Sequence, residues 1–551
     1  MRRNAFRILI AGISCLVSPF FAADLRADGL PRQAQASGQL GKVDFPTSCS
    51  ADVQPTIEKA VALLHSFQYT ESEKTFADAS TRDPKCAIAD WGKAMALFHQ
   101  LWDFPNDNIL KKGRKNIEQA QKLHTANARE QAFIAAAAAF FQKKSKLSHI
   151  ERTQSYSSAL EKLHAQSPDD VEISAFYALS LVSLAEEDHD NELADRRKAI
   201  SILNPLLQQH PDHPGVAHYM IHATDRPEFA AQGLEAARHY AAIAPDSAHA
   251  LHMPSHIFVR LGLWQDSITS NIAANSSGAH AAEMHLAESH YQTHAMDFLS
   301  YSYLQSGQEA KAREVIEHTD HVVGADEDAK AERRAWYAAR TALELHRWKE
   351  AAALPVAAPR KNWEDTTYWA RAIGAARSGN VAGAESDVKE LTELVADREK
   401  RSKKSGYNVS TEKASDLREA EAWLAFAKGK PDEALAELRA AADHQDKNGG
   451  ESVGIPAREM LADMLMELKR PAEAIAEYKT VLKNSPNRFD ALFGAVRAAA
   501  SIHSPASQAE VENYSAQLMS CCGFGGDRPE IKALARYTPG HEIEVLPSGY
   551  E

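Results

Sequence analysis

Cysteine is scarce in this sequence, and none of it is arranged for redox catalysis. The chain has five cysteines in 551 residues, and no two of them have the C-x-x-C spacing of a thioredoxin-like site. In an oxidising compartment, Cys49 and Cys86 are suited to join the first helix pair by a disulfide. Cys521 and Cys522 are adjacent, so a vicinal disulfide, a soft-metal site and a pair of buried thiols are the alternatives for them.

Catalytic motifs and membrane spans are also missing. The sequence has no His-Glu-x-x-His pattern, and no Gly-x-Ser-x-Gly elbow, phosphate loop or dinucleotide fingerprint in a strand-turn-helix context. Beyond the N-terminus no stretch approaches about 18 uninterrupted apolar residues, so we expect no transmembrane segment in the mature chain. The sequence therefore favours a protein that is not an enzyme.

Positive charge is in deficit. The formal net charge is −13, with 62 Lys and Arg against 75 Asp and Glu. An acidic surface argues against nucleic acid and anionic lipid as partners. Hydrophobic residues at 44% and charged residues at 25% are typical of a folded protein, and 551 residues require either several domains or one solenoid.

The N-terminus has the pattern of an export signal. Three arginines precede an apolar stretch over residues 8–21, and two alanines follow it. This pattern predicts a signal peptide over residues 1–23 and a periplasmic or secreted mature protein. A lipid attached at Cys15 and an uncleaved signal anchor are the alternatives.

Beyond the signal, the apolar spacing is helical almost throughout, and no run alternates as a strand would. Six helix-turn-helix breaks recur at intervals of 33 to 50 residues, at Gly262, Gly307, His346, Gly379, Gly429 and Lys469. Each precedes a small residue by five positions, namely Ser267, Ala312, Ala351, Ala384, Ala434 and Ala474. A small side chain there lets the second helix of a pair approach the first, and glycine tolerates the conformation that ends a helix.

The order of small, large, aromatic and proline positions over residues 461–486 matches the tetratricopeptide repeat of about 34 residues. The sequence therefore predicts an all-α fold, a right-handed α-solenoid of tetratricopeptide-type helix pairs with irregular insertions. We predict a signal peptide (1–23), a flexible N-terminal segment (24–48), a histidine-rich N-terminal solenoid (49–320), middle repeats (321–400), an exposed connection (401–412), C-terminal repeats (413–503) and a C-terminal cap or tail (504–551).

Histidine is concentrated in one part of the chain, because twelve of the 24 histidines lie between positions 210 and 294. Three pairs have the i,i+4 spacing that places two side chains on one helical face: His218/His222, His252/His256 and His290/His294. The first two pairs are 34 residues apart, so we expect them at equivalent positions on the first helices of neighbouring repeats.

Two interpretations of these histidines compete. Neutral imidazole is the commonest metal-ligand side chain, which predicts a site for a divalent transition metal such as zinc. Its ligands would be His218, His222, His252 and His256, completed by Asp225 or His294. The other interpretation is a ligand groove shaped by hydrogen-bonded packing residues without a metal. That groove would be lined by His218, His222, His249, His252, His256, Arg260 and His294.

Two neighbouring residues bear on the groove. Arg260 is the candidate for binding a ligand carboxylate. Pro254 lies between His252 and His256, where it either kinks a helix or begins one. If it begins one, His249 and His252 are expected on the preceding loop.

The segments 213–223 and 249–258, with 64–67 and 91–96, resemble a group of exported bacterial tetratricopeptide repeat proteins. The resemblance implies a concave groove that binds protein or peptide, and it implies no particular activity. We therefore predict an exported scaffold of undetermined oligomeric state that binds a protein or peptide ligand. A metal-binding protein or metal-dependent enzyme that uses the paired histidines is the alternative, and a structural subunit of an envelope complex is a third.

Overall fold

The computed structural model describes residues 39–143, 147–187, 192–284, 289–357, 361–404, 413–450, 452–523 and 525–535. The chain divides into two units, Met1–Gly38 and Gln39–Glu551. The first unit lies outside the described residues, and with it the predicted signal peptide. Residues 405–412 of the predicted connection and 536–551 of the predicted cap also lie outside them.

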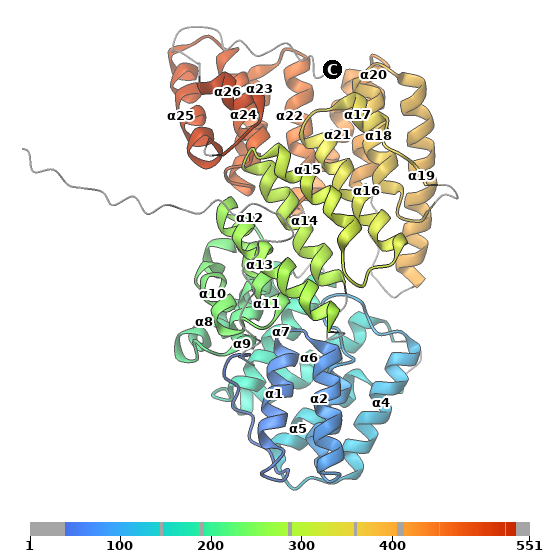
Figure 1. Ribbon diagram of the computed structural model, residues 1–551, viewed down its shortest axis with the longest axis vertical. Coiled ribbons are helices and arrows are strands. Elements are labelled where there is room, and N and C mark those ends of the chain that lie inside the picture. The colour runs from blue at the N-terminus through green and yellow to red at the C-terminus, as the bar shows by residue number, and fades with distance from the viewer. Residues whose placement is uncertain are drawn as a thin grey trace, which may run out of the picture. The chain divides into compact units, whose positions relative to one another are not determined.

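All regular structure in the described residues is helical, so the prediction of an all-α fold is confirmed. Neighbouring helices pack as antiparallel pairs, which follow one another along the chain as in a solenoid (Figure 1). The first part contains α1 (Gln54–His65), α2 (Tyr69–Arg82), α3 (Ala87–Met95), α4 (Asp107–Lys122), α5 (Ala128–Phe140), α6 (His149–Gln166), α7 (Val171–Glu187), α8 (Glu192–Gln209), α9 (Pro214–Thr224), α10 (Ala230–Ile243), α11 (Ala248–His252), α12 (Pro254–Arg260) and α13 (Trp264–Glu283).

The second part continues the pairing. It contains α14 (His290–Gln305), α15 (Glu309–His318), the 3-10 turn η1 (Thr319–His321), α16 (Glu327–Glu344), α17 (Trp348–Ala352), α18 (Asp365–Arg377), α19 (Val381–Lys404), α20 (Ser415–Ala427), α21 (Pro431–Lys447), α22 (Ala457–Glu467), α23 (Pro471–Asn484), α24 (Phe489–Ala500), α25 (Pro505–Cys522) and α26 (Pro529–Ala535). The predicted connection begins inside α19, and the predicted cap contains α25 and α26.

The six predicted turns have the backbone conformation expected of helix ends. All six have positive φ, from 53° at His346 to 83° at Gly379. The small residue five positions after each turn is fully buried at 0% exposure in every case, from Ser267 to Ala474. The turn and the small residue therefore act together: the first reverses the chain, and the second lets the helices of the pair pack closely.

The chain returns on itself, so that repeats far apart in sequence make contact. Helix α24 packs against α14, and Trp264 donates its indole N–H to the Asn487 carbonyl at 2.9 Å. Gly262 is tightly enclosed, because a Cβ atom there would lie 2.1 Å from the Pro486 carbonyl oxygen. These contacts seat the start of α13 directly against the turn before α24.

A buried ion-pair network reinforces the same junction. Arg488 is fully buried and its guanidinium contacts Glu344 at 2.9 Å and Glu459 at 2.7 Å. It also donates to the Tyr301 hydroxyl at 2.9 Å. Helices α14, α16 and α22 are thereby connected to the N-terminus of α24, and loss of any partner would leave a buried charge unpaired.

Residues 39–48, which were predicted to belong to a flexible segment, pack against the helices of the second unit, of which they are a part. Phe45 is fully buried and stacks on Trp91 with ring centroids 5.6 Å apart. The Gln39 N–H donates to Asp246 at 2.8 Å, and the Lys42 ammonium contacts Asp212 at 2.6 Å. No helix in the described part of the chain is both long and apolar enough to cross a membrane.

Candidate metal centre

Helix α9 carries the first histidine pair. Pro214 lies in the first turn of α9, where its missing N–H costs no hydrogen bond, and His213 caps the helix by accepting the Val216 N–H at 3.2 Å. The i,i+4 spacing then places His218 and His222 on one face, with their Nε2 atoms 3.0 Å apart.

The second pair straddles a break between two short helices. Helix α11 ends at His252 and α12 begins at Pro254, so the proline starts a helix and does not kink the middle of one. His249 and His252 lie on α11, and not on a loop. Met253 keeps helical dihedrals between the two helices, and the Nε2 atoms of His252 and His256 lie 3.1 Å apart.

Three histidines from α9 and α11 meet at one point, and we call His218, His222 and His249 the first trio. The Nε2 atom of His218 lies 3.0 Å from that of His222 and 3.0 Å from that of His249. All three side chains are buried. Nitrogens that share a tetrahedral metal ion at about 2.0–2.1 Å lie about 3.3 Å from one another. The spacing in the first trio is therefore close to that of metal-bound imidazoles.

The hydrogen bonds of His218 determine where its proton lies. Its Nδ1 is 2.6 Å from the main-chain oxygen of His65, which only accepts, so Nδ1 carries the proton and donates it. The Nε2 lone pair then faces two other Nε2 atoms, although one in-plane lone pair accepts one well-directed hydrogen bond. A cation bound to all three nitrogens removes this conflict. Donation from Nδ1 to a carbonyl is also typical of a metal-bound histidine.

His252, His256 and His294, from α11, α12 and α14, form what we call the second trio. One ring nitrogen from each lies within 4.8 Å of the others. The His294 ring centroid is 4.4 Å from that of His252 and 5.7 Å from that of His256. The sequence pattern paired His294 with His290, but His290 instead contacts Tyr291 at 4.0 Å between ring centroids.

The Nδ1 protons of His252 and His256 in the second trio both point away from the partner ring. Nδ1 of His252 donates to Oδ1 of Asn271 at 2.7 Å, and the Asn271 amide nitrogen donates to the Ser267 carbonyl, which fixes the amide orientation. Nδ1 of His256 donates to Oδ2 of Asp225 at 2.8 Å. In neutral rings the two Nε2 lone pairs therefore face each other across 3.1 Å, which requires a proton or a metal ion between them.

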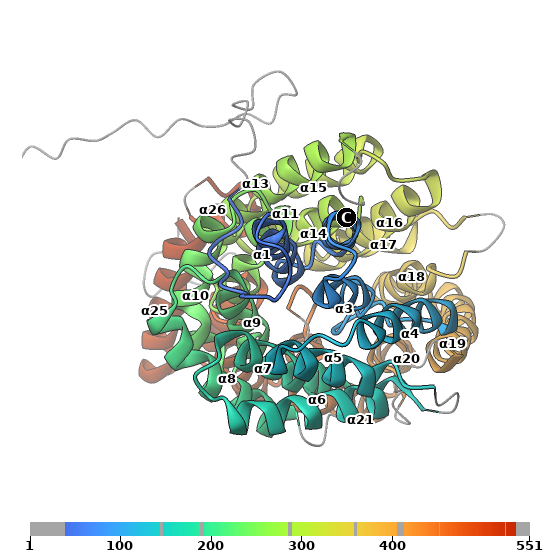
Figure 2. The same cartoon turned by 90° about the horizontal axis from the view of Figure 1, so that it is seen from below.

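The two trios are neighbours. Between the trios, the ring centroids of His222 and His256 are 6.3 Å apart, and those of His249 and His252 are 6.4 Å apart. Within the first trio, the ring centroids of His222 and His249 are 6.3 Å apart. The six histidines therefore form one continuous cluster. Helix α12 packs against α9 and α11, and α11 packs against α14, which lies beside it in Figure 2. The sequence hypothesis combined two histidines of each trio in a single site, whereas the structure separates them and adds His249.

Burial keeps five of the six imidazoles neutral, namely those of His218, His222, His249, His252 and His294. Desolvation lowers the pKa of His218 and of His294 to about 3. Desolvation also lowers the pKa of His222, His249 and His252 well below the ordinary value of 6.5, and neighbouring histidines add to the effect. Neutral imidazole is the form that binds a metal, so the environment favours ligation over protonation.

Asp225 lies behind the second trio, and not among its ligand atoms as the sequence hypothesis had it. Its Oδ2 accepts from His256, and its Oδ1 accepts from Nε of Arg260 at 2.9 Å. Burial opposes ionisation of Asp225, but Arg260 and His256 hold its pKa well below the usual range. A carboxylate in this position fixes the tautomer and orientation of a metal-binding histidine.

Arg260 is engaged by the chain itself. Besides Asp225, its guanidinium donates to the carbonyls of Gly449 at 2.8 Å and Gly450 at 3.2 Å. Arg260 was predicted to bind a ligand carboxylate. In the structure its guanidinium N–H groups already donate to groups of the chain itself. The segment after α21 covers the part of the predicted groove formed by α12.

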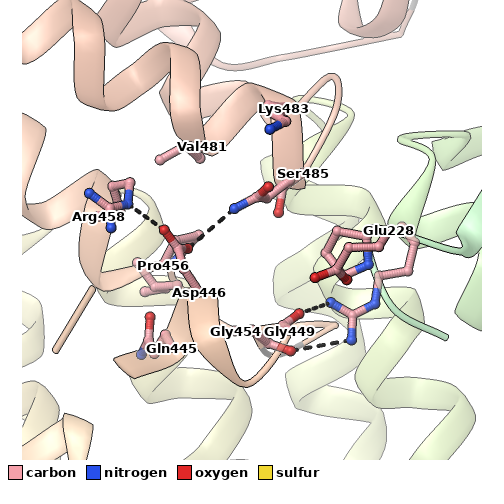
Figure 3. A pocket seen from close by; sticks show the side chains of 15 residues that line it. Glu228, Gln445, Asp446, Gly449, Gly454, Pro456, Arg458, Val481, Lys483 and Ser485 are labelled. Atoms are coloured by element: carbon pink, nitrogen blue, oxygen red, sulfur yellow. Dashed lines mark hydrogen bonds and ion pairs between the residues drawn. The ribbon is translucent and has the colours of Figure 1, made fainter. Parts of the chain in front are cut away.

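A cavity of about 200 Å³ lies beside Arg260, between Glu228 and the segment 449–456. Figure 3 shows Arg458 turned toward Asp446 on its far side, at 2.6 Å. Arg458 also contacts Glu477 at 2.6 Å, so its guanidinium is paired with carboxylates of the chain itself.

A buried network that sequence reasoning missed supports the first trio. Nδ1 of His65 lies 2.8 Å from the Tyr219 hydroxyl, and its Nε2 lies 2.8 Å from Glu172, which also contacts His213 at 3.0 Å. Burial opposes ionisation of Glu172, but His65 and His213 lower its pKa. The network fixes the His65 carbonyl that accepts from His218. Its members are up to 154 residues apart, and the only sequence signal was the resemblance over residues 64–67.

Aromatic side chains enclose the first trio and line a cavity that reaches it. Phe67 is buried at positive φ, and its ring centroid lies 4.4 Å from that of His218. A cavity of about 340 Å³ is lined by His249 together with Tyr69, Trp102 and Tyr291, among others. Trp102 is 37% exposed, so the cavity wall extends from solvent-exposed Trp102 to His249 of the first trio.

The four cysteines in the described part of the chain are paired. The structure joins Cys49 to Cys86 with their Cα atoms 4.8 Å apart, which connects the segment before α1 to the N-terminus of α3. It also pairs Cys521 with Cys522 at the end of α25, the vicinal arrangement among the three alternatives.

Comparisons with known proteins bear mainly on the C-terminal repeats. The tetratricopeptide repeat family model matches residues 419–489 and 459–514. No match was found among curated proteins. Among solved structures, the chain is similar to the human IFIT1 dimer with m7Gppp-AAAA, at 11% identity over 87% of this chain and 96% of that one, with a TM-score of 0.35. It is also similar to the APC/C hetero-tetramer Cut9-Hcn1, at 12% identity over 88% and 90%, with a TM-score of 0.31. Scores this low do not bear on the ligands of this chain.

Proposed function

We propose that this chain uses its helical-repeat scaffold, of which residues 419–489 and 459–514 match the tetratricopeptide repeat model, to hold a divalent transition-metal ion in the second trio. One observation carries the proposal. The Nε2 atoms of His252 and His256 lie 3.1 Å apart while Asn271 and Asp225 accept the proton of each Nδ1. A metal ion supplies the positive charge that two facing lone pairs require.

The ligand set narrows the choice of metal. Three neutral imidazoles suit zinc, copper, nickel and iron, whereas magnesium, calcium and manganese prefer oxygen ligands. Copper binds most tightly in the order of divalent stabilities, and zinc is the ion that the sequence analysis suggested. Three protein ligands also leave a coordination position for a water molecule or another small ligand.

We also propose that the protein is exported to the periplasm or the medium. The basic, apolar and small-residue pattern of residues 1–23 supports this proposal. A disulfide between Cys49 and Cys86 supports it independently, because disulfides persist in oxidising compartments. Cell fractionation with N-terminal sequencing tests it, and an unprocessed chain in the cytoplasm would contradict it.

A protein or peptide partner is proposed for the repeats of residues 419–514. The family match supports this placement. The groove formed by α12 is the weaker candidate, because Arg260 there binds the chain's own Gly449 and Gly450 carbonyls.

The decisive experiment measures the metal content of untagged protein by mass spectrometry, alongside a His252→Ala/His256→Ala variant. We expect at least one equivalent of zinc or copper in the native protein and the loss of one equivalent in the variant. His318→Ala/His321→Ala is the matched control, because it removes two exposed histidines whose ring centroids are 5.9 Å apart. Circular dichroism checks that all three proteins keep the same helicity. A native protein that binds added zinc and copper no better than the His252→Ala/His256→Ala variant would refute the proposal.

A further inference from the structure

We infer that the first trio is a second metal position and that the six histidines form one dinuclear centre, in which a small anion such as hydroxide or azide is shared between the two ions. This inference rests on the proposed metal binding at the second trio. Beyond that proposal, the chain would bind two ions, the two ions would interact, and a small anion would be their shared ligand.

The first trio has the properties of a metal position in its own right. The Nε2 atom of His218 lies 3.0 Å from both other Nε2 atoms, and its Nδ1–H is donated to the His65 carbonyl. Phe67 covers the trio from one side, with its ring centroid 5.6 Å from that of His222 and 5.7 Å from that of His249. The convergent nitrogens therefore lie in an apolar enclosure, where an unsatisfied polar contact is costly and a metal ion resolves it.

A single helix connects the two trios. Helix α11 contributes His249 to the first trio and His252 to the second, and these residues are three positions apart. The ring separations of 6.3 and 6.4 Å between the trios equal the longest separation within the first trio. Ions bound in both trios would therefore be close neighbours held by one rigid turn of helix.

The charge balance of the cluster favours an anionic ligand. Histidine ligands bring no negative charge, and in the described residues Asp225 is the carboxylate that hydrogen-bonds to a trio histidine. Asp225 is already balanced by Arg260, and nearby Asp297 contacts Arg340 at 2.6 Å. Two divalent ions would add four positive charges to a buried site, and three-coordinate ions retain open positions. A shared anion lowers that charge and fills both positions.

A route for the anion is present on the side of the first trio. His249 lines the cavity of about 340 Å³ whose wall includes Trp102 and Tyr291. The Tyr291 hydroxyl donates to the Phe67 carbonyl at 2.9 Å, so this part of the wall is anchored to the residue that covers the trio. Small anions reach the cluster here without displacing a helix.

Copper(II) is the probe that separates one site, two independent sites and a coupled pair. The full-length protein is stripped of metal and titrated with copper(II) while binding is followed by metal analysis and electron paramagnetic resonance. We expect two copper ions per chain, with an integrated signal well below two spins or a half-field transition that reports two close ions. Added azide should produce one new absorption band that saturates at one azide per two copper ions.

Two single variants divide the centre. His249→Gln and His294→Gln each remove one ligand, and in the described part of the chain neither ring donates to a side chain through Nδ1, so no partner is left unpaired. Each variant should bind one copper ion tightly and give a full one-spin signal. His318→Gln/His321→Gln is the control, which should keep both ions and their coupling.

The outcomes separate this inference from the proposal beneath it. No tight copper binding at all would sink the proposed metal function itself. One copper per chain, lost in His294→Gln and kept in His249→Gln, would leave that function standing and overturn the dinuclear centre. Two coppers with the summed spectra of two isolated ions would likewise overturn it.

Discussion

Replacing Asp225 with asparagine tests whether a carboxylate behind the second trio controls metal binding. In the native protein one carboxylate accepts from His256 at 2.8 Å and from Arg260 at 2.9 Å. Asparagine keeps the size of the side chain but has one neutral acceptor oxygen, and so it serves one of these donors and presents an N–H₂ group to the other.

The structure sets the expected magnitudes. The side chains of Arg260 and Asp225 are 9% and 17% exposed, so the bond between them is a largely buried, charge-assisted hydrogen bond. Hydrogen bonds to charged groups contribute about 1.5–3 kcal/mol, and we expect a loss of stability in that range for the metal-free protein. Removing the partner that orients a metal-binding histidine lowers metal affinity by about 10- to 100-fold.

Both quantities are measurable with one control. Urea unfolding of the metal-free protein gives the stability, and competition with a chelator gives the metal affinity. Asp266→Asn is the matched control, because Asp266 is a half-exposed partner of Arg238 at 3.7 Å, where an ion pair contributes at most about 1 kcal/mol. If Asp225→Asn binds metal as tightly as the native protein, then Asp225 does not orient a ligand and the reasoning fails.

Three further predictions follow from other parts of the structure. Replacing Cys49 and Cys86 by serine should lower the free energy of unfolding by about 4 kcal/mol, the chain-entropy value for a loop with 37 residues of sequence separation, as measured by thermal unfolding. The control is the reduced native protein, which lacks the same disulfide and should be as stable as the serine variant. Gly215→Ala places a Cβ atom 2.3 Å from Nδ1 of His65. We therefore expect about 1–3 kcal/mol of destabilisation and weaker metal binding at the first trio. A variant with unchanged stability and metal affinity would show that the His65 network is not needed. The metal-free protein should lose stability as the pH falls from 6.5, because the unfolded chain binds protons that buried imidazoles such as His218, with a pKa of about 3, reject. Each such histidine contributes about 1.4 kcal/mol per pH unit, and a urea midpoint that is equal at pH 7.5 and pH 5 would argue against this.

The repeat architecture could be predicted because its determinants are local. A turn residue followed five positions later by a small residue can be recognised in the sequence. The structure has a residue at positive φ and a buried small residue at each of the six predicted turns, including the non-glycine turns at His346 and Lys469. The packing of residues 39–48 was not predictable in the same way, because Phe45 is buried by Trp91 and Phe133 from α3 and α5. The sequence of a short non-helical segment does not reveal which side chains bury it.

The candidate site was predictable in its residues but not in its grouping. The i,i+4 rule identified His218 with His222 and His252 with His256, and these pairs do approach at 3.0 and 3.1 Å. That rule acts within one helix and does not determine which helices meet. Glu172 and Asn271 lie on helices that carry none of the histidine pairs, so only tertiary packing brings them to the site.

The contact between Arg260 and Gly449 affects how the protein is made. In an open solenoid each repeat contacts its neighbours and can fold as soon as they are synthesised. Here Arg260 donates to Asp225 and also to the carbonyl of Gly449, which lies 189 residues further along the chain. The contacts that support the second trio are therefore incomplete until the chain beyond α21 has been synthesised. Contacts of such long sequence separation slow folding. The proposed metal uptake at the second trio is therefore expected after the C-terminal repeats have folded against α12.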